Sequence, residues 1–128
     1  MENKPICEID KYGNKYWFLN DLYHREDGPA IEYSDGTKKW FINGKQHRLD
    51  GPAIELISGT KYWYLNNRLH GLDGPAWIHN NGQSDWFIND YYVTKEIYSW
   101  ATENNIDLDN LTDIDKALIK LIWVDYGK

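Results

Sequence analysis

The chain has 128 residues, of which 14 are Lys or Arg and 20 are Asp or Glu, so its formal net charge is −6. This length suits one domain, and the excess of acidic residues disfavours nucleic-acid binding, which depends on clustered Lys and Arg. No stretch approaches the roughly 20 apolar residues that span a bilayer, so no membrane association is expected, and the first ten residues lack the apolar run of a secretory signal.

A 23-residue interval organises most of the chain. The residues that keep it in four copies are Trp17, Trp40, Trp63 and Trp86, together with Gly13, Gly36, Gly59 and Gly82 and with Asn20, Asn43, Asn66 and Asn89. Those that keep it in three copies are His24, His47 and His70 and the Gly-Pro-Ala triplets that begin at positions 28, 51 and 74. Such a unit is one supersecondary element that buries its apolar face by stacking on its neighbours.

In chain order, Pro5-Ile-Cys-Glu predicts a first strand that precedes the complete units. Each unit then has two runs that suit strands, because aromatic and β-branched residues fill them. The first runs are 15–20, 38–43, 61–66 and 84–89, and the second runs, which follow Gly-Pro, are 30–33, 53–57 and 76–79. Asn, Asp and Gly between the runs predict tight turns. We expect about eight strands in an elongated, twisted antiparallel sheet of stacked hairpins.

Side chains alternate between the two faces of a strand, so both faces of this sheet should carry aromatic rings. Trp40 and Ile42 are expected on one face, with Lys39 and Phe41 on the other. The four repeated Trp residues would form a ladder on the first face. The opposite ladder would consist of Phe18, Phe41, Tyr64 and Phe87.

The repeat stops after Asn89, and the sequence that follows favours helices. Thr94 can cap a helix that runs to about Glu103, and Thr112 can cap a second one that runs to about Asp125. The second helix would have one apolar face, made of Ile114, Ala117, Leu118, Leu121 and Ile122. We therefore expect hairpin repeats in residues 1–93 and, in residues 94–128, a cap of about two helices that hides the last repeat, all within one structural domain.

The repeated His and Asp residues are candidates for chemistry, because this pairing makes general bases and metal sites. Two strands per unit at about 4.8 Å place equivalent residues about 9–10 Å apart, too far for the three His to share a metal. We expect His and Asp to fix the bend before Gly-Pro through hydrogen bonds to the backbone. The alternative is a periodic row that contacts an extended partner. The candidate binding residues are Trp17, Trp40, Trp63, Trp86, His24, Arg25, His47, Arg48 and His70.

No motif of a catalytic, phosphate-binding or metal-binding site occurs in the sequence, so we expect no enzyme activity, no cofactor and no metal. Cys7 is the only cysteine. A lone thiol suits a reducing compartment, so a cytoplasmic location is expected.

The period, the Asp35-Gly-Thr-Lys opening and the segment from Trp40 to Lys45, followed by His47-Arg48, resemble MORN repeats. The further Asp50-Gly-Pro-Ala resembles a MORN-like variant common in bacteriophages and large DNA viruses. The resemblance covers about Gly13 to Asn89. It implies stacked antiparallel hairpins, a scaffold or protein-binding role and a viral origin. Trp replaces the usual Tyr-x-Gly and Gly-Pro-Ala replaces Gly-x-Gly, which together with the missing basic face disfavours lipid binding.

These observations favour a non-enzymatic interaction protein that binds and inhibits or redirects a host protein in the host cytoplasm. One alternative is a sponge or hydrolase for a small molecule such as a nucleotide, held in an aromatic pocket between sheet and helices. Another is a self-assembling scaffold, a homo-oligomer joined through the unpaired edge strand at residues 6–10.

Overall fold

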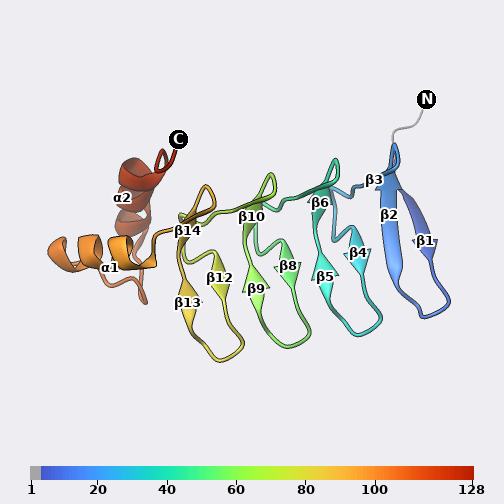
Figure 1. The fold of residues 1–128 in the computed structure, drawn as a ribbon, viewed down its shortest axis with the longest axis horizontal. Coiled ribbons are helices and arrows are strands. Elements are labelled where there is room, and N and C mark those ends of the chain that lie inside the picture. The colour runs from blue at the N-terminus through green and yellow to red at the C-terminus, as the bar shows by residue number, and fades with distance from the viewer. Residues whose placement is uncertain (1–3) are drawn as a thin grey trace.

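The computed structural model describes residues 4–128 and shows an elongated row of β-hairpins that ends in two helices (Figure 1). This confirms the fold class predicted from the repeats. The expectation that the chain begins without a secretory signal falls partly on residues 1–3, which lie outside the described residues. No helix in residues 4–128 combines the length and the apolar character needed to cross a membrane.

Eight strands follow one another across the main sheet, all antiparallel to their neighbours, and the sheet does not close into a barrel. The strands in spatial order are β1 (Ile6–Ile9), β2 (Lys15–Leu19), β4 (Ile31–Glu32), β5 (Lys38–Lys39), β8 (Ile54–Glu55), β9 (Lys61–Tyr62), β12 (Trp77–Ile78) and β13 (Ser84–Asp85). Spatial order follows chain order, as stacked hairpins require. β1 is the additional strand predicted before the first complete unit.

The structure corrects the prediction for the first run of each unit. Only β2 is continuous, and in the later units the strand is interrupted at Trp40, Trp63 and Trp86. The second halves are β6 (Phe41–Ile42), β10 (Tyr64–Leu65) and β14 (Phe87–Ile88). They pair in this order with β7 (Lys45–Gln46), β11 (Arg68–Leu69) and β15 (Tyr91–Tyr92). In the first unit, β2 pairs in the same way with β3 (Leu22–Tyr23). Each unit thus carries a second, smaller hairpin, which extends from β2 of the main sheet in the first unit and lies beside the main sheet in the later ones.

The smaller hairpins arise from the turn that was expected to join the two main runs. Asn43 has φ 49° and Gly44 has φ 77°. Positive φ at both central residues is the mark of a two-residue type I′ turn, which returns the chain antiparallel to the strand that it has just left. The Asn turn therefore closes a hairpin of its own, and the chain reaches the next main strand only after the His and Gly-Pro segment.

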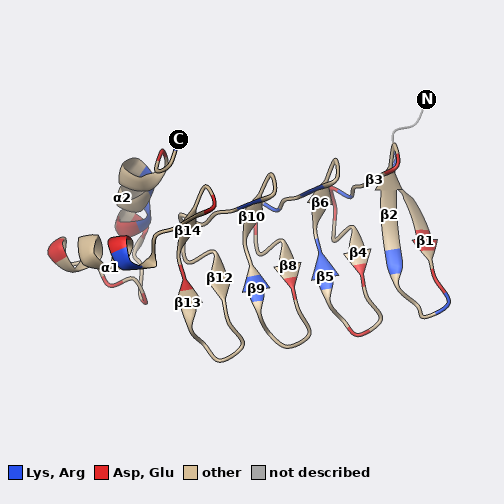
Figure 2. Cartoon of the chain, in the orientation of Figure 1, with Lys and Arg blue, Asp and Glu red and all other residues tan. Residues whose placement is uncertain are grey.

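Basic and acidic residues alternate from strand to strand across the main sheet (Figure 2). The register places Lys15, Glu32, Lys38, Glu55 and Lys61 in one row on one face. Opposite charges on neighbouring strands favour this register. The row ends at β12 and β13, where Ile78 and Ser84 occupy the next two positions.

The two helices are α1 (Thr94–Glu103) and α2 (Asp113–Trp123). The predicted start of α2 is confirmed, since the Thr112 hydroxyl accepts a hydrogen bond from the Asp115 N–H at 3.1 Å and the Asp115 carboxylate accepts one from the Thr112 N–H at 3.1 Å. Thr94 is not the cap of α1, because Val93 holds that position. The Thr94 hydroxyl accepts instead from the Trp86 N–H at 2.8 Å and ties the helix to the last unit.

The largest buried cluster lies between the last unit and the helices. Its members are Trp86, Ile88, Val93, Ile97, Ala101, Leu108, Ile119 and Trp123. The helices thus cover the end of the sheet, as Figure 1 shows, and they leave the earlier units open. This agrees with the prediction of a cap over the last repeat.

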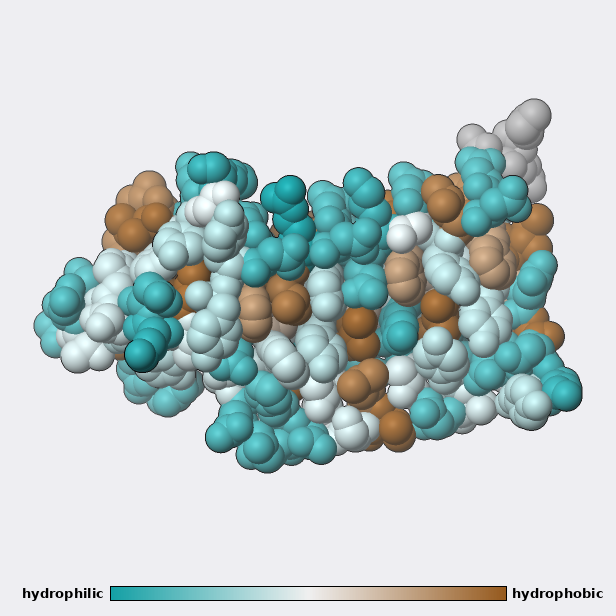
Figure 3. Space-filling model, in the orientation of Figure 1, coloured by the Kyte–Doolittle hydropathy of each residue, from teal (hydrophilic) through white to brown (hydrophobic). Residues whose placement is uncertain are grey.

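The apolar face predicted for α2 does not pack against the sheet. Ile114 and Leu121 keep 79% and 74% of their surface exposed, whereas Ile119 and Trp123 are buried. Apolar residues occur all around α2, so periodicity alone does not decide which side faces the sheet. The Trp123 side chain packs into the core, and the predicted face remains on the outside, where Figure 3 shows hydrophobic surface over this helix.

Candidate functional site

The candidate site is the face of the sheet that carries Trp17, Trp40 and Trp63, with the three loops 24–29, 47–52 and 70–75. We call this surface the Trp face. The three rings are partly exposed, whereas Trp86 retains 1% of its surface and belongs to the core under the helices. Of the four Trp residues predicted as candidates, Trp86 is therefore inaccessible to a partner.

The repeated His residues join consecutive units. His24 Nδ1 accepts a hydrogen bond from the Asn43 N–H at 2.9 Å. The equivalent bonds run from Asn66 to His47 at 3.1 Å and from Asn89 to His70 at 3.0 Å. The predicted bond from His to backbone is thus present, but it reaches the Asn turn of the next unit and not the bend before Gly-Pro.

An accepting Nδ1 requires the neutral imidazole with its proton on Nε2. At His70, burial lowers the pKa below its usual value, and the charge of Lys128 lowers it further. The neutral form that the hydrogen bond needs is therefore favoured at this position.

Arg25 and Arg48 are held by groups of their own units. The guanidinium carbon of Arg48 lies 3.8 Å from the centre of the Trp40 ring, and its Nε donates to Asp50 at 2.9 Å. Its Nη1 donates to the Pro52 carbonyl at 3.1 Å and to Glu55 at 3.3 Å. The hydrogen bond and charge of Arg48 hold the pKa of the Asp50 carboxyl below its usual value.

Arg25 repeats this arrangement in the preceding unit. It lies 4.0 Å from the centre of the Trp17 ring and bonds Asp27, the Pro29 carbonyl and Glu32 at 3.0, 3.2 and 3.3 Å. The prediction for the Asp residues is thereby corrected: Asp27 and Asp50 fix the loops by pairing with an Arg side chain, and not through the backbone.

The third unit lacks this cover. Gly71 and Ile78 stand where the second unit has Arg48 and Glu55. Both members of the Arg–Glu pair are thus replaced together, and no guanidinium of residues 4–128 lies over the Trp63 ring.

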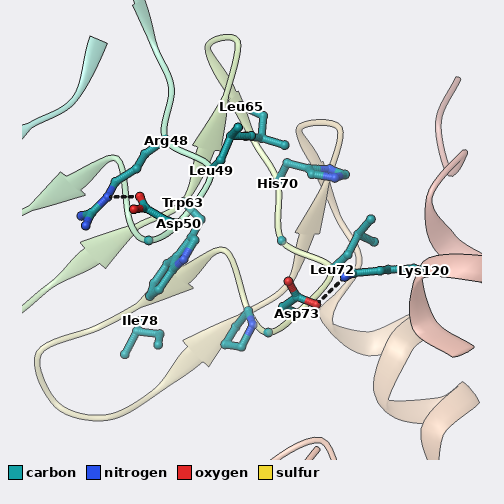
Figure 4. A pocket seen from close by; sticks show the side chains of 14 residues that line it. Arg48, Leu49, Asp50, Trp63, Leu65, His70, Leu72, Asp73, Ile78 and Lys120 are labelled. Carbon is teal, nitrogen blue, oxygen red and sulfur yellow. Dashed lines mark hydrogen bonds and ion pairs between the residues drawn. The ribbon is translucent and has the colours of Figure 1, made fainter. Parts of the chain in front are cut away.

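Open grooves of about 670 Å³ at Trp63 and about 770 Å³ at Trp40 separate the loops of successive units. Around Trp63 the apolar lining includes Leu49, Leu65, Leu72 and Ile78 (Figure 4). Lys120 of α2 reaches the rim and pairs with Asp73 at 3.0 Å.

Sequence reasoning missed several residues of the Trp63 groove. Leu49 and Leu72 occupy equivalent positions 23 residues apart, but the first unit has Glu26 there, so this position lies outside the pattern that all units share. The replacement of Arg and Glu by Gly71 and Ile78 is visible when the units are aligned, so this signal could have been used. Lys120 lies outside the repeats, and only the placement of α2 brings it to the groove.

The described part of the chain has no group of three or more His, Cys, Asp and Glu arranged to hold a metal ion. Comparison of the chain with family models, with curated proteins and with solved structures finds no match.

Proposed function

We propose that this protein is a non-enzymatic interaction module that binds a partner polypeptide along its Trp face. One observation carries the proposal: the helices cover the last Trp of the series, while the grooves at Trp40 and Trp63 remain open. A host protein is the kind of partner that the resemblance to viral repeat proteins implies.

The composition of the grooves suits protein recognition. Each groove combines a Trp ring and apolar side chains with charged residues at its rim, such as Asp73 and Lys120 at the Trp63 groove. Binding energy at protein interfaces concentrates in buried Trp, Tyr and Arg anchors surrounded by a polar rim. Because the two grooves belong to successive units, an extended segment of a partner can occupy both.

The groove at Trp63 is tested by filling it. A Cβ atom added at Gly74 meets no heavy atom within 4 Å, so Gly74→Tyr places a ring at the groove without a clash of its Cβ. Gln83→Tyr, at an exposed hairpin tip, adds the same side chain away from the groove and serves as the control. Affinity capture from the source cells, with quantitative mass spectrometry, should recover a stoichiometric partner with the wild type and the control but lose it with Gly74→Tyr. Equal recovery with all three proteins, or no partner with the wild type, contradicts the proposal.

Self-assembly is a second candidate, favoured by β1. Within residues 4–128 this strand pairs only with β2, and Ile6 and Ile9 keep 70% and 64% of their surface exposed. An unpaired strand edge can add a strand from another chain. Light scattering that reports a monomer across a wide concentration range excludes this candidate and leaves the first proposal intact.

A further inference from the structure

We propose that the Trp63 groove binds an arginine side chain of the partner, whose guanidinium takes the place that Arg25 and Arg48 fill in their own units. This inference rests on the proposed function, since it names the chemistry by which the Trp face recognises a polypeptide. The repeat itself supplies the template, because two units show the bound group and the third has three of the four equivalent residues without it.

The second unit defines what holds the guanidinium. The planar group stacks on Trp40, and its donors reach one oxygen of Asp50, the Pro52 carbonyl and Glu55. The first unit has the same four partners at the same positions of the repeat. A guanidinium is planar and has several N–H donors in fixed directions, so it can stack on a ring and donate hydrogen bonds at the same time. An ammonium group has no planar face to stack.

The third unit keeps three of these four groups. Trp63, Asp73 and Pro75 are the equivalents of Trp40, Asp50 and Pro52. Among residues 4–128, none donates a hydrogen bond to the Pro75 carbonyl, whereas the Pro29 and Pro52 carbonyls accept from Arg25 and Arg48. Ile78 replaces the fourth group, which makes the floor of the groove more apolar beside the Trp63 ring.

The chain cannot supply this guanidinium itself. A Cβ atom at Gly71 would lie 2.5 Å from the Gly74 carbonyl oxygen, so the loop that replaces the Arg-bearing one excludes a side chain at this position. Lys120 pairs with Oδ1 of Asp73 at 3.0 Å but does not stack on Trp63. In the first two units the Arg Nε donates to one carboxylate oxygen of Asp27 or Asp50. Lys120 likewise contacts one oxygen of Asp73, so Oδ2 of Asp73 can accept from an incoming guanidinium.

The test uses N-acetyl-arginine amide as the probe and the full chain labelled with ¹⁵N. The indole N–H signals, assigned by single Trp→Phe variants, report each ring separately. We expect the Trp63 signal to shift in a saturable manner with a dissociation constant in the millimolar range. Trp17 and Trp40 should shift less, because Arg25 and Arg48 already occupy the stacking position over their rings. The uncharged isostere N-acetyl-citrulline amide should bind at least about fivefold more weakly, because it lacks the charge that Asp73 pairs with. No shift at Trp63, or equal affinity for both probes, overturns the inference.

Two variants separate a guanidinium site from a merely apolar one. Ile78→Glu restores the fourth acceptor, in a position that Glu32 and Glu55 already occupy in the same row, and should tighten binding of the arginine probe by about threefold to fivefold. Asp73→Asn should weaken it by a similar factor. If Ile78→Glu binds the arginine probe more weakly than the wild type does, the inference is overturned. If Ile78→Glu does not fold, the inference is overturned when Asp73→Asn binds the probe as tightly as the wild type.

Failure of this inference is distinguishable from failure of the proposed function. If a partner is captured and Asp73→Asn leaves its affinity unchanged, the Trp face binds by another contact and only the arginine site is wrong. If the probe binds as expected but no partner is recovered, the site stands and the proposed function is wrong.

Discussion

Replacement of His24 by Leu tests whether the His residues join consecutive units. His24 keeps 5% of its surface exposed, and its Nδ1 accepts from the Asn43 N–H at 2.9 Å. Leu fills a similar volume but offers no acceptor, so the Asn43 N–H loses its partner. Asn43 lies at the surface, where water can replace part of the lost bond, so the cost is that of a typical hydrogen bond, about 0.5–1.5 kcal/mol. The ring also lies near Glu26, but that carboxylate is exposed, so its loss adds little.

His24→Asn is the matched control, because its amide oxygen can accept the same hydrogen bond. The free energy of unfolding, measured in urea through Trp fluorescence, should fall by about 0.5–1.5 kcal/mol for His24→Leu and by less for His24→Asn. Hydrogen exchange of the Asn43 amide gives the local measurement: exchange should accelerate in the Leu variant and stay slow in the Asn variant. Equal stability and unchanged exchange in His24→Leu would refute the role of His24 as a link between units.

Three further predictions concern the cap and the pH response. Ile97→Ala removes a fully buried side chain from the core beneath the helices and should lower the unfolding free energy by about 2–5 kcal/mol in urea denaturation. Thr112→Ala removes the cap of α2 and should cost about 0.5–2 kcal/mol, whereas Thr112→Ser should restore most of it. The pKa of His70 lies below 6.5 in the folded state because of burial and Lys128, so the folded protein binds fewer protons than the unfolded chain. The His70 contribution to stability is therefore complete above pH 6.5 and is lost as the pH falls through the folded pKa. Between about pH 7.5 and 5, the urea midpoint of the wild type should fall more than that of His70→Asn. An equal change of the two midpoints contradicts this.

The repeat made most of the fold predictable. Equal spacing of Trp, Gly and Asn requires equivalent elements, and stacking of equivalent hairpins leaves one simple architecture. The second hairpin of each unit was missed because its strands are two residues long, too short for a pattern of alternation. Asn43-Gly44 carried the signal, since this pair favours a two-residue hairpin and not a turn between distant strands.

The direction of α2 was not predictable from periodicity. Ile114, Leu118 and Leu121 form an apolar stripe, but Ile119 and Trp123 form another on the opposite side. The second stripe faces the core because Trp86 and Ile97 offer a complementary surface there, and this information lies in the tertiary structure.

The candidate site was predictable in its repeated part only. Repetition pointed to the Trp, His and Arg residues, and the structure shows that His24 bonds the next unit whereas Arg48 fixes the loop of its own unit. The open groove arises where the third unit departs from the pattern, at Gly71 and Ile78. A departure carries more information about a unique site than the repeat does, because the repeat reports what all units share.

The most direct measurement for the central claim is hydroxyl-radical footprinting of the tryptophans, with and without the captured partner. In the free protein, Trp63 should be oxidised readily and Trp86, at 1% exposure, hardly at all. In the complex, Trp63 should become protected while Tyr12, exposed at the far end of the sheet, keeps its reactivity. Protection at the far end without protection of Trp63 would contradict the assignment of the Trp face as the binding surface.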